Sequence, residues 1–206
     1  MQKQFGFILL ILSISSFSFS SQKDKSESQS ELKHIIQGEF ESSFGKGWQF
    51  SWNLNSTPHR IFGKSIPQDF DANDPIASEY AARDFILNHP SLFNIYEENL
   101  DLWVNEQHGN LRYLIFNQVY ENIPVWNGRI DFRYRLNGDL VMIGHDAFPN
   151  LNVNTNPGVS MDQAIFYSKI HVDFDENLND EVIGDPELYI WVESGREPEY
   201  HRCWHL

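Results

Sequence analysis

The chain has 206 residues, with 41% hydrophobic and 15% aromatic side chains and a formal net charge of −14. This length and apolar content predict one medium or two small folded domains rather than a disordered chain. The negative charge disfavours binding to nucleic acids and to anionic membrane surfaces, because their phosphates carry the same sign.

The N-terminus has the layout of a secretory signal peptide. Lys3 precedes the apolar run Phe5–Ile14, and the small side chains of SSFSFSSQ follow it. We expect cleavage near Ser20, which makes residues 1–20 a signal peptide and places the mature protein outside the cytoplasm, without a membrane partner. A membrane anchor is the alternative, although the apolar run is short for a bilayer span. The single cysteine, Cys203, allows no disulfide within the chain.

A first folded module is predicted over residues 47–150, after a flexible polar lead-in at 21–46. The sequence GWQFSWNL alternates aromatic and polar residues, as does a strand with one buried face, and TPHRIFG adds a second short strand. In DPIASEYAARDFILNHP, Asp74 is the predicted N-cap and Pro75 the first residue of a helix that ends before Pro90.

This helix is expected to bury Ala77, Tyr80, Ala81 and Phe85, which recur at helical spacing. Glu79 and Arg83 are expected to form an outward ion pair. After the helix, Leu92 and Phe93 are expected to pack the chain against the core.

Four strand-like segments follow in series. LRYLIFNQVY is apolar on both faces, which is typical of a central strand. RIDFRYRL alternates apolar residues with Asp131, Arg133 and Arg135, so one face of this strand is expected to contact water. Asn137-Gly138 predicts a tight hairpin turn into DLVMIGH. A helix beside an antiparallel meander is an α+β arrangement.

Residues 151–206 are predicted to form a smaller second module after the linker FPNLNVNTNPG. Ser160 and Gln163 form a predicted capping box at the start of a helix. PELYIWVES and EYHRCWHL then predict a β-hairpin over GREP. The predicted fold class is therefore α+β, with a helix-then-strands plan that occurs once on a large and once on a small scale.

The sequence contains no recognised catalytic motif. None of its eight histidines begins a His-Glu-x-x-His zinc motif, and no nucleophile elbow, P-loop or dinucleotide fingerprint occurs. Carboxylate pairs such as Glu97-Glu98 lie in polar segments, where we expect them to be solvated surface charges rather than acid–base catalysts. We therefore predict no catalytic residue, no bound cofactor and no metal ion in this chain.

Two local clusters raise the alternative of a metal site. His201, Cys203 and His205 alternate along a predicted strand, so they share one face and could hold a metal ion or offer a thiolate to the metal of another domain. The favoured interpretation is an ordinary exposed strand face, with the intervening side chains on the other side. The segment DFDEN at 173–177 could bind calcium, but it lacks the glycine and the spaced glutamate of a calcium loop.

The segment NQVYENIPVWNGRIDFRYRLNGDLV resembles the propeptide of secreted thermolysin- and fungalysin-type zinc metalloproteases. The matching positions are Gln118, Tyr120, Ile123, Pro124, Val125, Asn127, Gly128 and Gly138. AARDFILNHPSLFNI is similar to the helix of the same fungalysin/thermolysin propeptide (FTP) module, and TPHRIFG to the strand before it. VSMDQAIFYSKI and YHRCWHL are similar to the PepSY module that follows, a cystatin-like helix and hairpin.

Within this block, the residue types predict a change in the path of the chain. Pro124 is expected to interrupt the strand ladder, and Gly128 to adopt a positive φ and restart the chain as a new strand. Gln118 and Tyr120 are expected to hold this crossover with hydrogen bonds. The alternative is a plain hairpin corner that packs Trp126.

The resemblance implies a prodomain of a secreted metalloprotease precursor. Such a prodomain docks on the catalytic domain in cis or in trans, acts as its intramolecular chaperone, and blocks its cleft until cleavage. Zinc is expected only in that catalytic domain, which lies outside this sequence. The chain is therefore expected to be a truncated or excised part of a longer precursor. The alternative is a free-standing secreted protease inhibitor or binding module.

Overall fold

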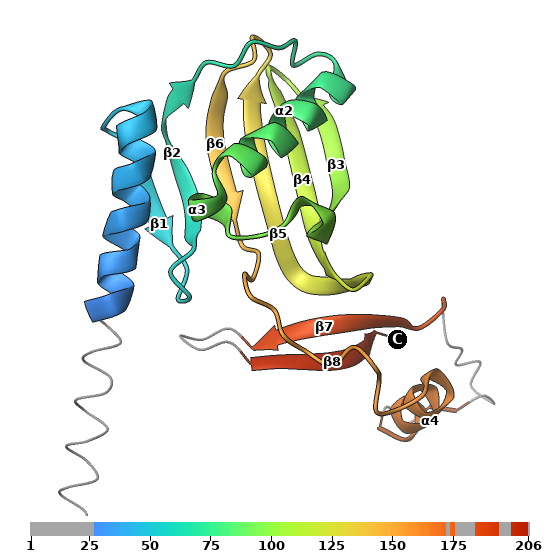
Figure 1. Cartoon of the computed structure of the whole chain (residues 1–206). Coiled ribbons are helices and arrows are strands. Elements are labelled where there is room, and N and C mark those ends of the chain that lie inside the picture. Colours follow the sequence, from blue (N-terminus) through green and yellow to red (C-terminus); the bar gives the residue numbers. More distant parts are fainter. Residues whose placement is uncertain (1–26, 172–173, 176–183, 194–198, 206) are drawn as a thin grey trace, which may run out of the picture. The chain divides into compact units, whose positions relative to one another are not determined.

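The computed structural model of the chain describes residues 27–171, 174–175, 184–193 and 199–205 (Figure 1). The chain divides into two compact units, residues 1–46 and residues 47–206. The predicted signal peptide lies outside the described residues.

The first unit contains a helix where the sequence analysis predicted a flexible lead-in. Residues 27–44 are helical. Leu32, Ile36, Phe40 and Phe44 recur every fourth residue, which aligns apolar side chains along a helix. The rings of Phe40 and Phe44 lie 4.9 Å apart. The prediction of a flexible segment is wrong for residues 27–44, because this apolar periodicity favours a helix despite the polar start of the segment.

The second unit is built on an antiparallel sheet with the strand order β1-β2-β6-β5-β4-β3. These strands are β1 (Gln49–Trp52), β2 (Pro58–Ile66), β3 (Leu100–His108), β4 (Leu111–Tyr120), β5 (Ile123–Arg135) and β6 (Leu140–His145). A hairpin of β7 (Glu187–Glu193) and β8 (Glu199–His205) follows later in the chain. The helical elements are α2 (Pro75–Asn88), α3 (Pro90–Phe93), η1 (Glu97–Asn99) and α4 (Met161–His171). The predicted α+β class is confirmed.

Helix α2 lies across one face of the sheet (Figure 1). Asp74 caps the helix as predicted, because its carboxylate accepts hydrogen bonds from the backbone N–H groups of Ile76, at 2.8 Å, and Ala77. Phe85 packs edge-on against Phe132 of β5, with ring centroids 6.0 Å apart. The helix is thereby fixed over the centre of the sheet.

The buried face of α2 contains Phe85, as predicted, but differs from the predicted face at the other positions. The buried residues are Ser78, Ala82, Phe85 and Ile86. Tyr80, which was expected in the core, is 73% exposed. Small side chains at the contact let the helix approach the sheet closely, and a tyrosine there would hold it away. The predicted ion pair is present, with Arg83 Nε 2.8 Å from Glu79 Oε1. It is only partly exposed, because the Arg83 guanidinium lies over the ring of the buried Phe116, 4.9 Å from its centroid.

The face of β5 that was predicted to contact water carries a buried acid. Asp131 is 1% exposed, because Gly144 of β6 has no side chain and leaves room for the carboxylate. Arg133 Nη2 lies 3.1 Å from Asp131 Oδ1, and Arg60 Nη2 lies 3.7 Å from Oδ2. Two guanidinium groups therefore offset the buried charge. Arg135, at the end of the strand, is exposed as predicted.

His145, the last residue of β6, is fully buried. Its Nε2 donates a hydrogen bond to the carbonyl oxygen of Phe93 at 2.8 Å, whereas Nδ1 is buried without a hydrogen-bond partner. A second ring proton would therefore sit on a nitrogen that has neither water nor an acceptor. Burial lowers the pKa of His145 from its ordinary value of 6.5 to about 4.

We predict that acid destabilises the second unit through His145. As the pH falls from 6.5 to about 4, the unfolded chain takes up a proton that the folded chain excludes. Up to about 3 kcal/mol of unfolding free energy is lost over this window. The variant His145→Gln cannot titrate, so its urea-unfolding midpoint should depend less on pH. The exposed His108→Gln serves as the control, and an unchanged pH dependence in His145→Gln would contradict this assignment.

Candidate functional site

In the block IPVWNG, the strand β5 interrupts its pairing with β4 and contacts β7 instead. The strands β4 and β5 pair on both sides of Gln118, but their register shifts at this point. Opposite this one residue, β5 accommodates the four residues 125–128 as a bulge. Within the bulge, Val125 pairs in parallel with Ile190 of β7. The block therefore connects the large sheet to the C-terminal hairpin.

The predicted role of Gly128 is wrong. The strand β5 is continuous through this position, and the positive φ, of 59°, belongs to Asn127. Gly128 is required by close packing instead, since a Cβ atom there would lie 2.7 Å from Oε1 of Gln118. Pro124 lies inside the strand, directly before the bulge, where a missing N–H is tolerated.

Gln118 fixes this crossover with both ends of its side-chain amide. Its Nε2 donates to the carbonyl oxygen of Phe148 at 2.8 Å, and the Phe148 N–H donates to Oε1 at 2.8 Å. The side chain is almost fully buried. These bonds tie β4 to the chain that leaves β6, so Gln118 has the geometry that the sequence analysis predicted. Tyr120, which was expected to hydrogen-bond here, contributes by packing.

A small hydrophobic core attaches the hairpin to this crossover. Its buried centre consists of Val125, Ile190 and Val192. The partly buried residues packed around it are Tyr120, Ile123, Phe148, Leu151, Val153 and Tyr200. The apolar residues of the IPVWNG block thus serve as core for the second sheet.

Gly138 closes the hairpin between β5 and β6, as predicted. Its φ is 91°, and a Cβ atom there would lie 2.7 Å from the carbonyl oxygen of Gln68. The Gly138 N–H donates to the Arg135 carbonyl at 2.9 Å. A side chain at this position would therefore meet both backbone strain and a clash.

The three residues of the alternative metal cluster share one face of β8, as the alternation along the strand predicted. Opposite His201, Cys203 and His205, the Cα partners on β7 are Trp191, Tyr189 and Glu187. A different set of residues brings its possible ligand atoms together in the described part of the chain. Those of Glu193, Glu199 and His201 lie within 4.8 Å of one another, and all three residues are exposed. Burial raises the pKa of the Cys203 thiol, which opposes the thiolate that a metal needs.

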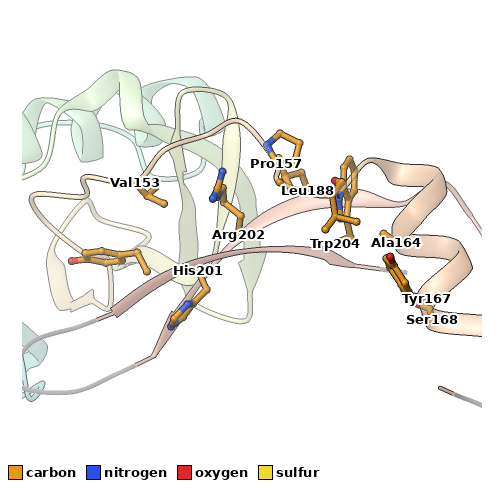
Figure 2. Close-up of a pocket in the computed structure, with 12 residues that line it drawn as sticks. Val153, Pro157, Ala164, Tyr167, Ser168, Leu188, His201, Arg202 and Trp204 are labelled. Carbon is orange, nitrogen blue, oxygen red and sulfur yellow. Dashed lines mark hydrogen bonds between the residues drawn. The ribbon is translucent and has the colours of Figure 1, made fainter. Parts of the chain in front are cut away.

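A pocket of about 530 Å³ lies between the hairpin, the linker and helix α4 (Figure 2). Arg202 donates to the carbonyl of Asn156, and Trp204 Nε1 donates to the carbonyl of Val159 at 2.9 Å. These bonds hold the linker along one wall, and Tyr167 of α4 lines another. The helix and the hairpin are predictable from the sequence but this pocket is not, because local patterns do not define the space between two elements.

Helix α4 begins at the predicted capping box but leaves apolar side chains in water. The Ser160 N–H donates to Gln163 Oε1 at 3.0 Å, and the Gln163 N–H donates to Ser160 Oγ at 3.3 Å. None of its residues is buried. Phe166, Tyr167 and Ile170 are 60%, 51% and 59% exposed. Exposed apolar surface of this kind is typical of an interaction site.

No catalytic arrangement is evident among the described residues. The most buried ionisable side chains, Asp131, Tyr134 and His145, lie in the large sheet, and none of them lines the pocket of Figure 2. Burial raises the pKa of Tyr134, so its hydroxyl stays protonated. Of the segment DFDEN, only residues 174–175 are described.

No helix in the described part of the chain has the length and apolarity needed to cross a membrane. The choice between a signal peptide and a membrane anchor concerns residues 1–20, which lie outside that part.

Comparisons with known proteins give a distant structural likeness. No protein-family model matches the chain, and no curated protein matches it. Among solved structures, the Bacillus megaterium YpeB C-terminal domain is similar, with a TM-score of 0.37 and 15% sequence identity. The match covers 71% of this chain and 59% of that chain, so this chain spans less than two thirds of its length. A likeness this low transfers no function.

We predict that a methyl group at position 128 breaks the contact with Gln118. The added carbon of Gly128→Ala would lie 2.7 Å from Gln118 Oε1 and 3.1 Å from Val125 Cγ1. We expect a loss of about 2 kcal/mol in unfolding free energy, measured by urea denaturation. Gly158→Ala is the matched control, because a Cβ atom there meets nothing within 4 Å. Equal stability of the two variants would show that this packing is not needed.

Proposed function

We propose that the chain is a protein-binding prodomain of a secreted zinc metalloprotease precursor. It acts as a folding aid and an inhibitor of a catalytic domain, in cis or in trans. The observation that carries the binding role is the exposed apolar surface of α4, formed by Phe166, Tyr167 and Ile170. A helix in a folded domain ordinarily buries such side chains, so a partner that covers them gains roughly 25 cal/mol for each Å² removed from water.

The finer assignment to a metalloprotease prodomain is supported by the sequence resemblance of the IPVWNG block. In this chain the block forms a junction fixed by Gln118 and Phe148. A rigid junction suits a folding aid, because a preorganised template loses little conformational entropy when it binds. Selective binding to the near-native catalytic domain then stabilises that state and also blocks its cleft.

The negative charge of the chain favours a partner with a positively charged surface. With a net charge of −14, the chain associates fastest with a positively charged surface, and salt weakens this steering. A specific interface of this type buries roughly 1,600 Å². A free-standing inhibitor would use the same surface against a protease carried on a separate chain.

Trans inhibition tests this proposal directly. The purified protein is titrated into thermolysin-type zinc metalloproteases of the source organism, and hydrolysis of a fluorogenic peptide is measured. We expect saturable inhibition of at least one protease and no hydrolysis by the protein alone. Replacing Phe166 and Ile170 together with Ser should weaken inhibition at least about tenfold, because two exposed apolar contacts are lost.

The matched control for this pair is Leu87→Ser on α2, which removes an equally accessible apolar side chain, 59% exposed. We expect the control to inhibit as strongly as the unaltered protein. Proteases that remain fully active in a hundredfold excess of the protein, with no complex on size-exclusion chromatography, would refute the prodomain role.

A further inference from the structure

The outward face of the hairpin β7–β8 carries aromatic rings gathered around Trp126 of the β5 bulge. The centroid of the Trp126 ring lies 5.3 Å from that of Tyr189 and 6.2 Å from that of Trp191. From the neighbouring strand, the His205 ring lies 5.5 Å from Trp126. Trp191 is 45% exposed. An indole this accessible, beside a second indole, offers a π surface to a ligand.

A cavity of about 490 Å³ opens beside these rings. The residues that line this aromatic cavity are Trp126, Asn127, Phe148, Trp191, Val192 and Glu193. Its volume falls within the roughly 300–1,000 Å³ that is usual for ligand pockets. Glu193 is the one charged residue in this lining, so a carboxylate stands next to two indole rings.

The surroundings of the aromatic cavity are acidic. The side chains of Glu193 and Glu199 are 73% and 76% exposed, and His201 Nε2 lies 3.9 Å from Glu193 Oε2 and 4.0 Å from Glu199 Oε2. Both distances exceed hydrogen-bond length, so the two carboxylates remain available to a ligand. The described residues of β7 and β8 place no lysine or arginine on this face, because Arg202 lines the pocket on the opposite face. The local charge therefore attracts a cation.

We propose that the aromatic cavity binds a cationic side chain, arginine or lysine, of the partner protein. The π faces of Trp126 and Trp191 attract the positive group, and Glu193 forms a charge-assisted hydrogen bond with it. The identity of the partner rests on the proposed function, whereas the preference for a cation rests on the cavity alone.

Other ligand classes match this cavity less well. An anion would be repelled by Glu193 and Glu199. A neutral ring would stack on the indoles but would gain nothing from the negative charge. A cation uses both features, and a basic side chain agrees with the net charge of −14, which favours a positively charged partner.

Peptide binding tests this preference whatever the identity of the partner. The purified full chain is titrated into a fluorescein-labelled peptide, Gly-Gly-Arg-Gly-Arg-Gly-Gly, and polarisation is measured. A second peptide carries citrulline, which keeps the shape of arginine but has no charge. We expect the arginine peptide to bind at least about tenfold more tightly than the citrulline peptide, since only the charged group gains from the carboxylate and the π faces.

Variants then assign the binding to the cavity. Trp191→Ala and Glu193→Gln should each weaken binding of the arginine peptide by about five- to tenfold. The matched controls are Trp103→Ala and Glu106→Gln on β3, whose side chains are also exposed, and these should bind like the unaltered protein. Glu193 projects into solvent, so Glu193→Gln tests the proposal even if Trp191→Ala folds poorly.

Equal affinity for the two peptides, or equal losses in the cavity and control variants, would overturn the proposal. These outcomes are independent of the prodomain assignment. A protein that inhibits a metalloprotease but does not prefer the arginine peptide would refute the cavity proposal alone. A protein that prefers the arginine peptide but inhibits no metalloprotease would refute the prodomain proposal alone.

Discussion

The side-chain amide of Gln118 holds the chain at the point where the large sheet meets the C-terminal hairpin. Its two hydrogen bonds to Phe148, each 2.8 Å long, satisfy a buried donor and a buried acceptor at once. Each such group left without a partner would cost about 1–3 kcal/mol. The amide thereby fixes the path of the linker after β6. It also shapes the bulge at 125–128, through which β5 reaches β7.

Both surfaces assigned to binding depend on this junction. Trp126 belongs to the bulge, so its ring meets Tyr189 and Trp191 only while the bulge keeps its shape. Phe148, which Gln118 holds, lines the aromatic cavity and packs on the small core of the hairpin. The linker then continues to α4 and its exposed apolar side chains. Because the junction holds both surfaces in place before binding, less conformational entropy is lost when a partner binds.

Apart from Gln118, whose role followed the family resemblance, the local features that the sequence predicted correctly depend on bonds between near neighbours. The cap at Asp74, the capping box at Ser160 and the turn at Gly138 each involve residues a few positions apart. The burial of Asp131 and the packing of Gly128 depend on adjacent strands, which periodicity within one strand does not reveal. For the same reason the aromatic cavity was missed, because the bulge and β7 meet only after the chain has folded.

Amide hydrogen exchange followed by NMR measures the dependence of the hairpin on Gln118 most directly. In the unaltered protein we expect slow exchange at the Phe148 amide and along β7. In Gln118→Leu we expect both regions to lose protection while β5 at Phe132 stays protected. The control Gln107→Leu, at an exposed position of β3, should change the protection of neither region. Protection along β7 that persists in Gln118→Leu would contradict the role of this amide as the junction between the two sheets.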